Sequence, residues 1–156
     1  MSLPLKKEET VTNVAHASHP VSALVLNCMD HRLVAAVTEY LHGRGLQGQY
    51  DQISLAGGAI GILSDQNTPW AETFWAQLAL ARDLHGVRKV IMIDHRDCGA
   101  CKAFVGKDCA KDRDRELALH LNAMKALSTE IRKRAPEMTV ELLFMELDGS
   151  VTRLDG

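Results

Sequence analysis

The sequence predicts an α/β fold: a doubly wound, mostly parallel sheet of four strands, a candidate antiparallel edge strand at the C-terminal end, and helices on both faces. Two observations support this. Short, almost entirely apolar runs alternate along the chain with longer segments whose apolar residues recur at helical spacing. Such runs are typical of strands buried on both faces. Strands that alternate with helices form parallel sheets.

The expected strands are the short apolar runs. They are Val21–Asn27, Tyr50–Leu55, Lys89–Asp94 and Thr139–Leu147. After the last of them, Asp148-Gly149 offers a tight turn into Val151–Leu154. A hairpin with an edge strand is therefore expected at this end of the sheet.

The expected helices have apolar residues on one stripe. They are Leu33–His42, Trp70–His85 and Asp112–Ala135. Proline at position 69 and glycine at position 86 bracket the second helix, as proline inside the start and glycine past the end of a helix usually do. Pro136 ends the third helix.

Length and composition bound the class of protein. A chain of 156 residues fits one domain, so residues 21–156 are expected to form a single α/β domain and the polar residues 1–20 an N-terminal arm. The net charge of −2 and the pI near 6.4 give no basic surface for nucleic acid. No apolar run approaches the roughly 18 residues that a membrane helix needs, and no signal peptide is evident. We therefore expect no membrane partner, a cytoplasmic location, and four cysteines that serve as metal ligands or core residues rather than disulfides.

Candidate metal ligands follow two of the expected strands. Cys28 comes directly after the first strand, and His95 and Cys98 follow the third. In open α/β sheets, ligands bind beyond the carboxyl ends of the strands, where the strand order switches. We expect the first and third strands to lie side by side there, which puts the three side chains within reach of one ion. Two thiolates and an imidazole suit zinc and leave a position open for water.

Asp30 and Arg32 lie beside this expected zinc site. Arg32 can hold the Asp30 carboxylate in a bidentate fork, which is how ligand-neighbouring groups are commonly oriented. Asp30 is also a candidate fourth ligand. An ordinary ion pair at a helix N-terminus is the alternative interpretation.

Two segments carry a resemblance to a known family. Cys28-Met29-Asp30-His31-Arg32 and His95-Arg96-Asp97-Cys98-Gly99 resemble the two signature segments of the beta-class carbonic anhydrases, and Ala56-Gly57-Gly58 resembles the Ala-Gly segment between them. The likeness runs from about residue 21 to residue 148, and the chain looks similar to the short bacterial members. The resemblance implies zinc held by Cys28, His95 and Cys98. It also implies that Asp30 either ligates zinc in a closed form or pairs with Arg32 in an open one.

The activity implied by the resemblance is the zinc-dependent, reversible hydration of carbon dioxide to bicarbonate by a zinc-bound hydroxide. Asp30 and Arg32 would be catalytic, and backbone amides of Gly57 and Gly58 would hold a substrate oxygen. Ser54-Leu55 stands where the family often has Arg-Asn. Hydrolysis of carbonyl sulfide or carbon disulfide at the same site, or a catalytically silent zinc protein, are therefore the alternatives. The family's sites lie near subunit interfaces, so the resemblance also implies a homodimer or a higher oligomer.

Two further residues near the motifs, His31 and Cys101, have alternative interpretations. His31 is either a proton shuttle or a residue that packs or faces solvent. Cys98 and Cys101 form a C-x-x-C pair, which is either a redox motif or a ligand followed by an unrelated neighbour. Cys109 has no role that the sequence indicates.

Overall fold

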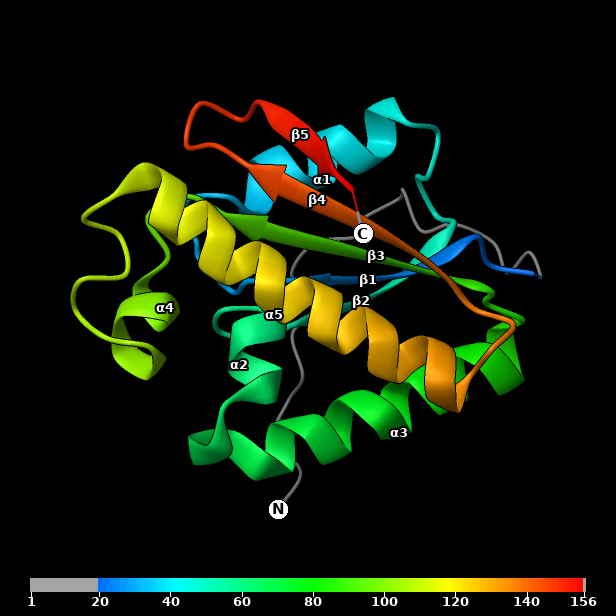
Figure 1. Cartoon of the computed structure of the whole chain (residues 1–156). Coiled ribbons are helices and arrows are strands. Elements are labelled where there is room, and N and C mark those ends of the chain that lie inside the picture. The colour runs from blue at the N-terminus through cyan, green and yellow to red at the C-terminus, as the bar shows by residue number, and fades with distance from the viewer. Residues whose placement is uncertain (1–19, 156) are drawn as a thin grey trace, which may run out of the picture.

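The computed structural model describes residues 20–155 (Figure 1). Its strands are β1 (Ala23–Asn27), β2 (Tyr50–Ser54), β3 (Lys89–His95), β4 (Thr139–Met145) and β5 (Val151–Leu154). Its helices are α1 (Val34–Gly43), α2 (Ala59–Leu63), the 3-10 turn η1 (Asp65–Asn67), α3 (Thr68–His85), α4 (Gly99–Phe104) and α5 (Arg113–Arg134). The arm expected over residues 1–20 lies outside the described residues, except for Pro20.

The five strands form one sheet in the order β2-β1-β3-β4-β5. The first four are parallel, and β5 pairs antiparallel with β4, from Leu142↔Leu154 to Met145↔Val151. The predicted α/β class and the C-terminal edge strand are therefore confirmed. β1 and β3 are neighbours, and the chain order switches between them, so their carboxyl ends border the crevice in which such sheets bind ligands.

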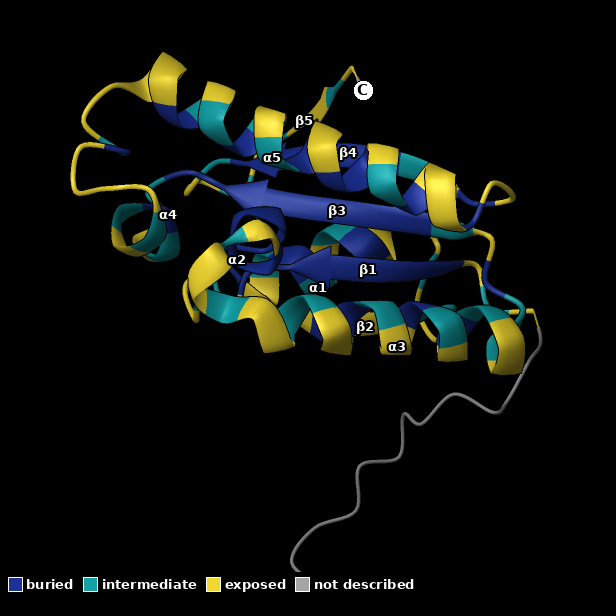
Figure 2. Cartoon of the chain, turned by 60° about the horizontal axis from the view of Figure 1, so that its bottom comes forward, coloured by how far each residue is buried: buried dark blue, intermediate teal, exposed yellow. Residues whose placement is uncertain are grey.

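Helices cover both faces of the sheet, because alternate residues of each strand point to opposite sides. Leu24 and Leu26 of β1 pack in a cluster with Phe74 of α3 and with residues of α2 and α5. Val25, between them, packs in a second cluster with Val37 of α1. Figure 2 shows the central strands in the buried colour, with the helices exposed on their outer sides only.

The two long helices begin and end where the sequence places their signals. Pro69 lies in the first turn of α3, and Gly86 ends the helix in the left-handed conformation, at φ 69°. Asp112 caps α5 by accepting a hydrogen bond from the backbone N–H of Arg115 at 2.8 Å. Both helices are amphipathic, and no helix within residues 20–155 is long and apolar enough to cross a membrane.

Two short helices, α2 and α4, were not predicted. They directly follow the site-forming ends of β2 and β3, and five or six residues are too few to show a helical period. In α2, a side chain at Gly61 would collide with the carbonyl oxygen of Ala56, so the helix folds back closely on the turn after β2. The backbone after each strand is thus held tightly at the edge where the site lies.

A buried carboxylate stabilises the opposite end of the sheet. Glu141 on β4 is 4% exposed and pairs with Arg44 after α1 and Lys89 at the start of β3. Burial opposes ionisation of Glu141, but the hydrogen bonds from Lys89 and Arg44 outweigh it and hold the pKa of the carboxyl below its ordinary 4.5. This pair of contacts joins α1 and β3 to β4.

We expect Glu141 to make stability fall with acid. A carboxyl whose pKa is lowered by folding contributes stability above its unfolded-state pKa, and that contribution is lost as the pH falls through the folded-state pKa. Urea unfolding at a series of pH values below neutrality should show this loss. In Glu141→Gln the unfolding free energy at neutral pH should be lower and its decline with acid shallower. An unchanged slope would contradict the assignment.

Candidate metal centre

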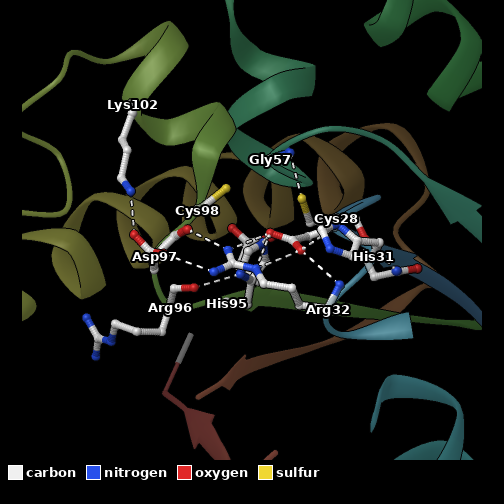
Figure 3. A network of polar contacts seen from close by, with 12 residues as sticks. Cys28, His31, Arg32, Gly57, His95, Arg96, Asp97, Cys98 and Lys102 are labelled. Atoms are coloured by element: carbon white, nitrogen blue, oxygen red, sulfur yellow. Dashed lines mark hydrogen bonds and ion pairs between the residues drawn. The ribbon is translucent and has the colours of Figure 1, made fainter. Parts of the chain in front are cut away.

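The carboxyl ends of β1 and β3 bring three buried side chains together (Figure 3). Cys28 follows β1, His95 is the last residue of β3, and Cys98 directly precedes α4. Their ligand atoms all lie within 4.8 Å of one another. The parallel pairing of β1 with β3 places these residues at one edge, although Cys28 is 67 positions before His95 in the chain.

The donor set fits a zinc ion. His95 Nδ1 lies 2.8 Å from the carbonyl oxygen of Arg96, so this nitrogen carries the proton and Nε2 keeps its lone pair. Nε2 is buried and meets no hydrogen-bond partner of standard geometry among residues 20–155. Buried polar atoms without a partner are rare, and a metal ion at this position would satisfy this one. Two cysteine sulfurs and an imidazole nitrogen are the ligands that zinc prefers, and three protein ligands are the number found in catalytic zinc sites.

A hydrogen bond joins the side chains of the two cysteines. The hydrogen bond from the Cys98 thiol, opposed by burial and helped by the His95 imidazole and by the Gly57 amide, lowers the pKa of Cys28 to about 4. The same hydrogen bond, together with burial, raises the pKa of Cys98. Of the two thiols, Cys28 is therefore the one that ionises more readily, and zinc binds cysteine as the thiolate.

Asp30 is paired with Arg32 rather than placed among the three ligand atoms. Arg32 Nε lies 3.0 Å from Asp30 Oδ1, and Arg32 Nη2 lies 2.7 Å from Oδ2, which is a bidentate fork. Hydrogen bonds from the Arg32 side chain hold the pKa of Asp30 well below its usual range, so the carboxylate is ionised at neutral pH. Asp30 Oδ2 also lies 4.0 Å from His95 Nε2. The carboxylate thus borders the space in front of the ligands while Arg32 holds it.

Asp97 fixes Arg32 from the other side, a role that the sequence analysis did not foresee. Its carboxylate accepts from Arg32 Nη1 at 3.0 Å, its carbonyl oxygen accepts from Nη2 at 3.0 Å, and Lys102 pairs with the carboxylate (Figure 3). Asp97 has a positive φ of 56°, which aspartate tolerates better than most residues. The sequence held one signal for this role, because Asp97 lies between the two candidate ligands in His95-Arg96-Asp97-Cys98.

The two glycines expected to bind substrate already have acceptors inside the protein. The Gly57 amide donates to Cys28 Sγ at 3.2 Å, and the Gly58 amide donates to the Leu55 carbonyl oxygen at 2.9 Å. Gly57 therefore stabilises negative charge on the Cys28 sulfur. Binding of a substrate oxygen by Gly57 and Gly58 stays a prediction, and it would require one of these hydrogen bonds to open.

We expect Gly58→Ala to destabilise the protein by about 2 kcal/mol or more. Gly58 has φ 51°, and a side chain there would collide with the buried carboxylate of Asp94. Urea unfolding measures the loss. The matched control is Gly43→Ala in α1, where the added methyl meets nothing within 4 Å and should leave stability unchanged or slightly raised. Equal stabilities for the two variants would contradict the close approach at Gly58.

A cleft of about 610 Å³ opens in front of the ligands. It is lined by both signature segments and by the start of α4: Cys28, Met29, Asp30, His31, Arg32, Ala56, Asp97, Gly99, Ala100 and Lys102. The His31 side chain is 94% exposed and lies 3.8 Å from Asp30, at the mouth of this cleft. Met29, also largely exposed, adds an apolar surface at the rim.

The expectation that no cysteine forms a disulfide is wrong for Cys101 and Cys109. The two are joined by a disulfide with a Cα–Cα distance of 6.0 Å, within the usual range for such a bond. Cys109 is 1% exposed although charged residues surround it in sequence, because the chain after α4 folds back onto this helix. With Cys101 already bonded, Cys98-Gly99-Ala100-Cys101 is not a free dithiol in this structure.

Comparison with known proteins identifies the family. A family model described as "Putative carbonic anhydrase" matches residues 18–155. The chain belongs to this family. Its relatives include two uncharacterized proteins, one from Rickettsia conorii with 28% identity over 85% of this chain and 72% of the relative, and one from Rickettsia bellii with 26% identity over 85% and 81%.

Solved beta-carbonic anhydrases share the fold. Isoform I from Trichomonas vaginalis aligns with a TM-score of 0.58 and 21% identity, over 92% of this chain and 87% of that one. The enzyme CafA from Aspergillus fumigatus aligns with a TM-score of 0.61 and 17% identity, over 88% and 76%. A tetrameric enzyme from Sordaria macrospora gives 0.58 and 12%, over 89% and 83%. The resemblance to the beta class is thus confirmed for family and fold.

Proposed function

We propose that this chain is a zinc-dependent carbonic anhydrase that interconverts carbon dioxide and bicarbonate. The observation that carries the proposal is the cluster of Cys28, His95 and Cys98, in which the buried His95 Nε2 meets no hydrogen-bond partner of standard geometry within the described residues. Membership of the carbonic anhydrase-like family supports it. When bound, zinc would supply the Lewis acidity that makes water a nucleophile near neutral pH.

The residues of the chain orient the reactants. Arg32 keeps the Asp30 carboxylate ionised and turned toward the cleft, with Oδ2 4.0 Å from His95 Nε2. Asp30 Oδ2 can accept a hydrogen bond from a water molecule in front of the ligands. This hydrogen bond would orient a lone pair of the water oxygen toward a substrate carbon. Met29 and the methyl groups of Ala56 and Ala100 give the cleft apolar lining, which suits a small, uncharged substrate.

The direct test combines metal analysis with a stopped-flow hydration assay on the zinc-loaded protein. We expect one zinc per chain after dialysis and carbon dioxide hydration across the neutral pH range. Zinc without hydration, but with release of hydrogen sulfide from carbonyl sulfide, would assign the sulfur substrate instead. Zinc with neither activity would leave a catalytically silent zinc protein, and absence of zinc would reject the proposed site.

We also propose that the chain forms a homodimer or a higher oligomer. The solved relative from Sordaria macrospora is tetrameric, and α3 carries two largely exposed leucines, Leu80 and Leu84, beside the edge strand β2. Such exposed apolar pairs favour burial against a partner. Size-exclusion chromatography with light scattering tests this, and a monomer at micromolar concentration would contradict it.

A further inference from the structure

Helix α5 presents two buried polar side chains to the segment that carries two of the ligands. Glu116 and His120 lie one helical turn apart on α5 and are 1% and 0% exposed. Figure 1 shows α5 lying across the sheet, with its first turns near α4 and the end of β3. Neither residue is among the metal ligands or the lining of the cleft.

Glu116 holds the turn between His95 and Cys98. Its Oε1 accepts a hydrogen bond from the backbone N–H of Cys98 at 3.0 Å, and its Oε2 accepts from Arg96 Nη1 at 3.2 Å. Arg96 is anchored further by a two-point contact with Glu146, at 2.9 Å and 3.1 Å. The Glu116 carboxylate therefore fixes the backbone of Cys98 and the side chain of Arg96, which is next to His95 in the chain.

His120 holds the residue on the other side of His95. Its Nδ1 lies 2.7 Å from Asp94 Oδ2, and Asp94 is 1% exposed. Asp94 Oδ1 points toward Gly58, where a β-carbon would collide with the carboxylate and lie 3.9 Å from the Cys28 amide nitrogen. Asp94, the residue before His95 on β3, thus lies between His120 of α5 and the turn at Gly58, which is close to the Cys28 backbone.

Burial of these groups is better explained by placement of the ligands than by stability alone. Removing carboxylates and a guanidinium from water carries a large cost, and buried ion pairs often add little net stability over apolar residues. Their contacts instead fall on Asp94, Arg96 and the Cys98 amide, which surround or include the ligand positions. Groups that orient metal ligands typically change metal affinity when they are replaced.

We infer that Glu116 and His120 are positioning residues that set His95 and Cys98 to face Cys28 for metal binding. This inference rests on the proposed zinc site. The new element is that part of the zinc affinity is assigned to α5, a helix that contributes no ligand. Replacing either residue should weaken zinc binding even though all three ligands remain.

The test measures zinc affinity of the full chain by competition with a chromophoric chelator, together with the visible spectrum of the cobalt-substituted protein. Glu116→Gln must lose one of its two contacts, because an amide has one accepting oxygen. We expect about a 10- to 100-fold weaker zinc affinity and an altered cobalt spectrum. The matched control is Glu141→Gln, which removes a buried, ion-paired carboxylate away from the ligand segment. It should lower unfolding stability while leaving zinc affinity and the cobalt spectrum unchanged.

A second pair of variants tests the inference even if Glu116→Gln fails to fold. His120→Leu leaves Asp94 without its partner and should weaken zinc binding, whereas His120→Asn, whose amide nitrogen can replace Nδ1, should restore most of the affinity. Wild-type zinc affinity in both Glu116→Gln and His120→Leu would overturn the inference. An equal loss of affinity in Glu141→Gln would overturn it too, since a general loss of stability would then explain the effect. If the unaltered chain binds no zinc, the proposed metal site itself fails and the inference falls with it.

Discussion

Replacing Cys98 with serine should leave the chain unable to retain zinc through dialysis and should abolish carbon dioxide hydration. A serine hydroxyl stays protonated at neutral pH and is a poor zinc ligand, so only Cys28 and His95 would remain. Structural zinc sites bind with an apparent free energy of about 10–16 kcal/mol, so losing one ligand of three should weaken binding on the order of 100-fold or more. Metal analysis and stopped-flow hydration measure the two effects.

The control for this variant removes sulfur atoms without removing a ligand. Cys101 and Cys109 belong to the same apolar cluster as Cys28 and Cys98, but their sulfurs are bonded to each other. The double variant Cys101→Ser/Cys109→Ser should be less stable and should still bind one zinc per chain. Full zinc retention by Cys98→Ser would show that the metal is held elsewhere.

Asp30→Asn should lower the hydration rate by about 100-fold while the zinc content stays the same. The carboxylate is held by Arg32 and lies outside the cluster of ligand atoms, so its loss should not release the metal. An amide in its place presents an N–H group as well as an oxygen and cannot be relied on to accept a hydrogen bond from water in the cleft. Parallel metal analysis and rate measurements on the same preparation separate the two properties.

Asp97→Asn is the comparison that isolates the role of Asp30. Asp97 also contacts Arg32, but its carboxylate is shared with Lys102, and its backbone carbonyl contact would survive the change. We expect a smaller loss of rate than in Asp30→Asn. Loss of zinc from Asp30→Asn would instead mean that Asp30 ligates the metal, and the pairing with Arg32 would then describe a different state.

The fold could be predicted from local signals because each long element carries its own pattern. The apolar run ending at Asn27 and the proline and glycine around α3 indicate their elements directly. The neighbouring position of β1 and β3 followed from the rule for open α/β sheets. The short helix α4 lacked such a signal, since six residues that begin with glycine do not display a period.

The clustering of Cys28, His95 and Cys98 was predictable because these residues lie in two compact motifs at strand ends. The distant side chains that contact those motifs, such as Glu116, could not be predicted. Glu116 is separated from Cys98 by 18 positions and reaches it only because α5 packs across the sheet. The pairing of Cys101 with Cys109 was likewise missed, since composition and expected location argued against it while the return of the chain after α4 favoured it. Contacts between distant segments depend on packing angles that a single sequence does not specify.

The disulfide between Cys101 and Cys109 has a practical consequence for following the metal centre. Of the four cysteines in the chain, it leaves Cys28 and Cys98 as the free ones, and both are buried. Under non-reducing conditions, every thiol that an alkylating dye can label therefore belongs to the proposed ligands. Labelling should be absent from the folded, metal-loaded chain and should reach two dyes per chain once the metal is chelated and the fold is opened. Comparing the labelling of the folded chain with and without a chelator would then show how far a bound metal, beyond burial alone, shields these two thiols.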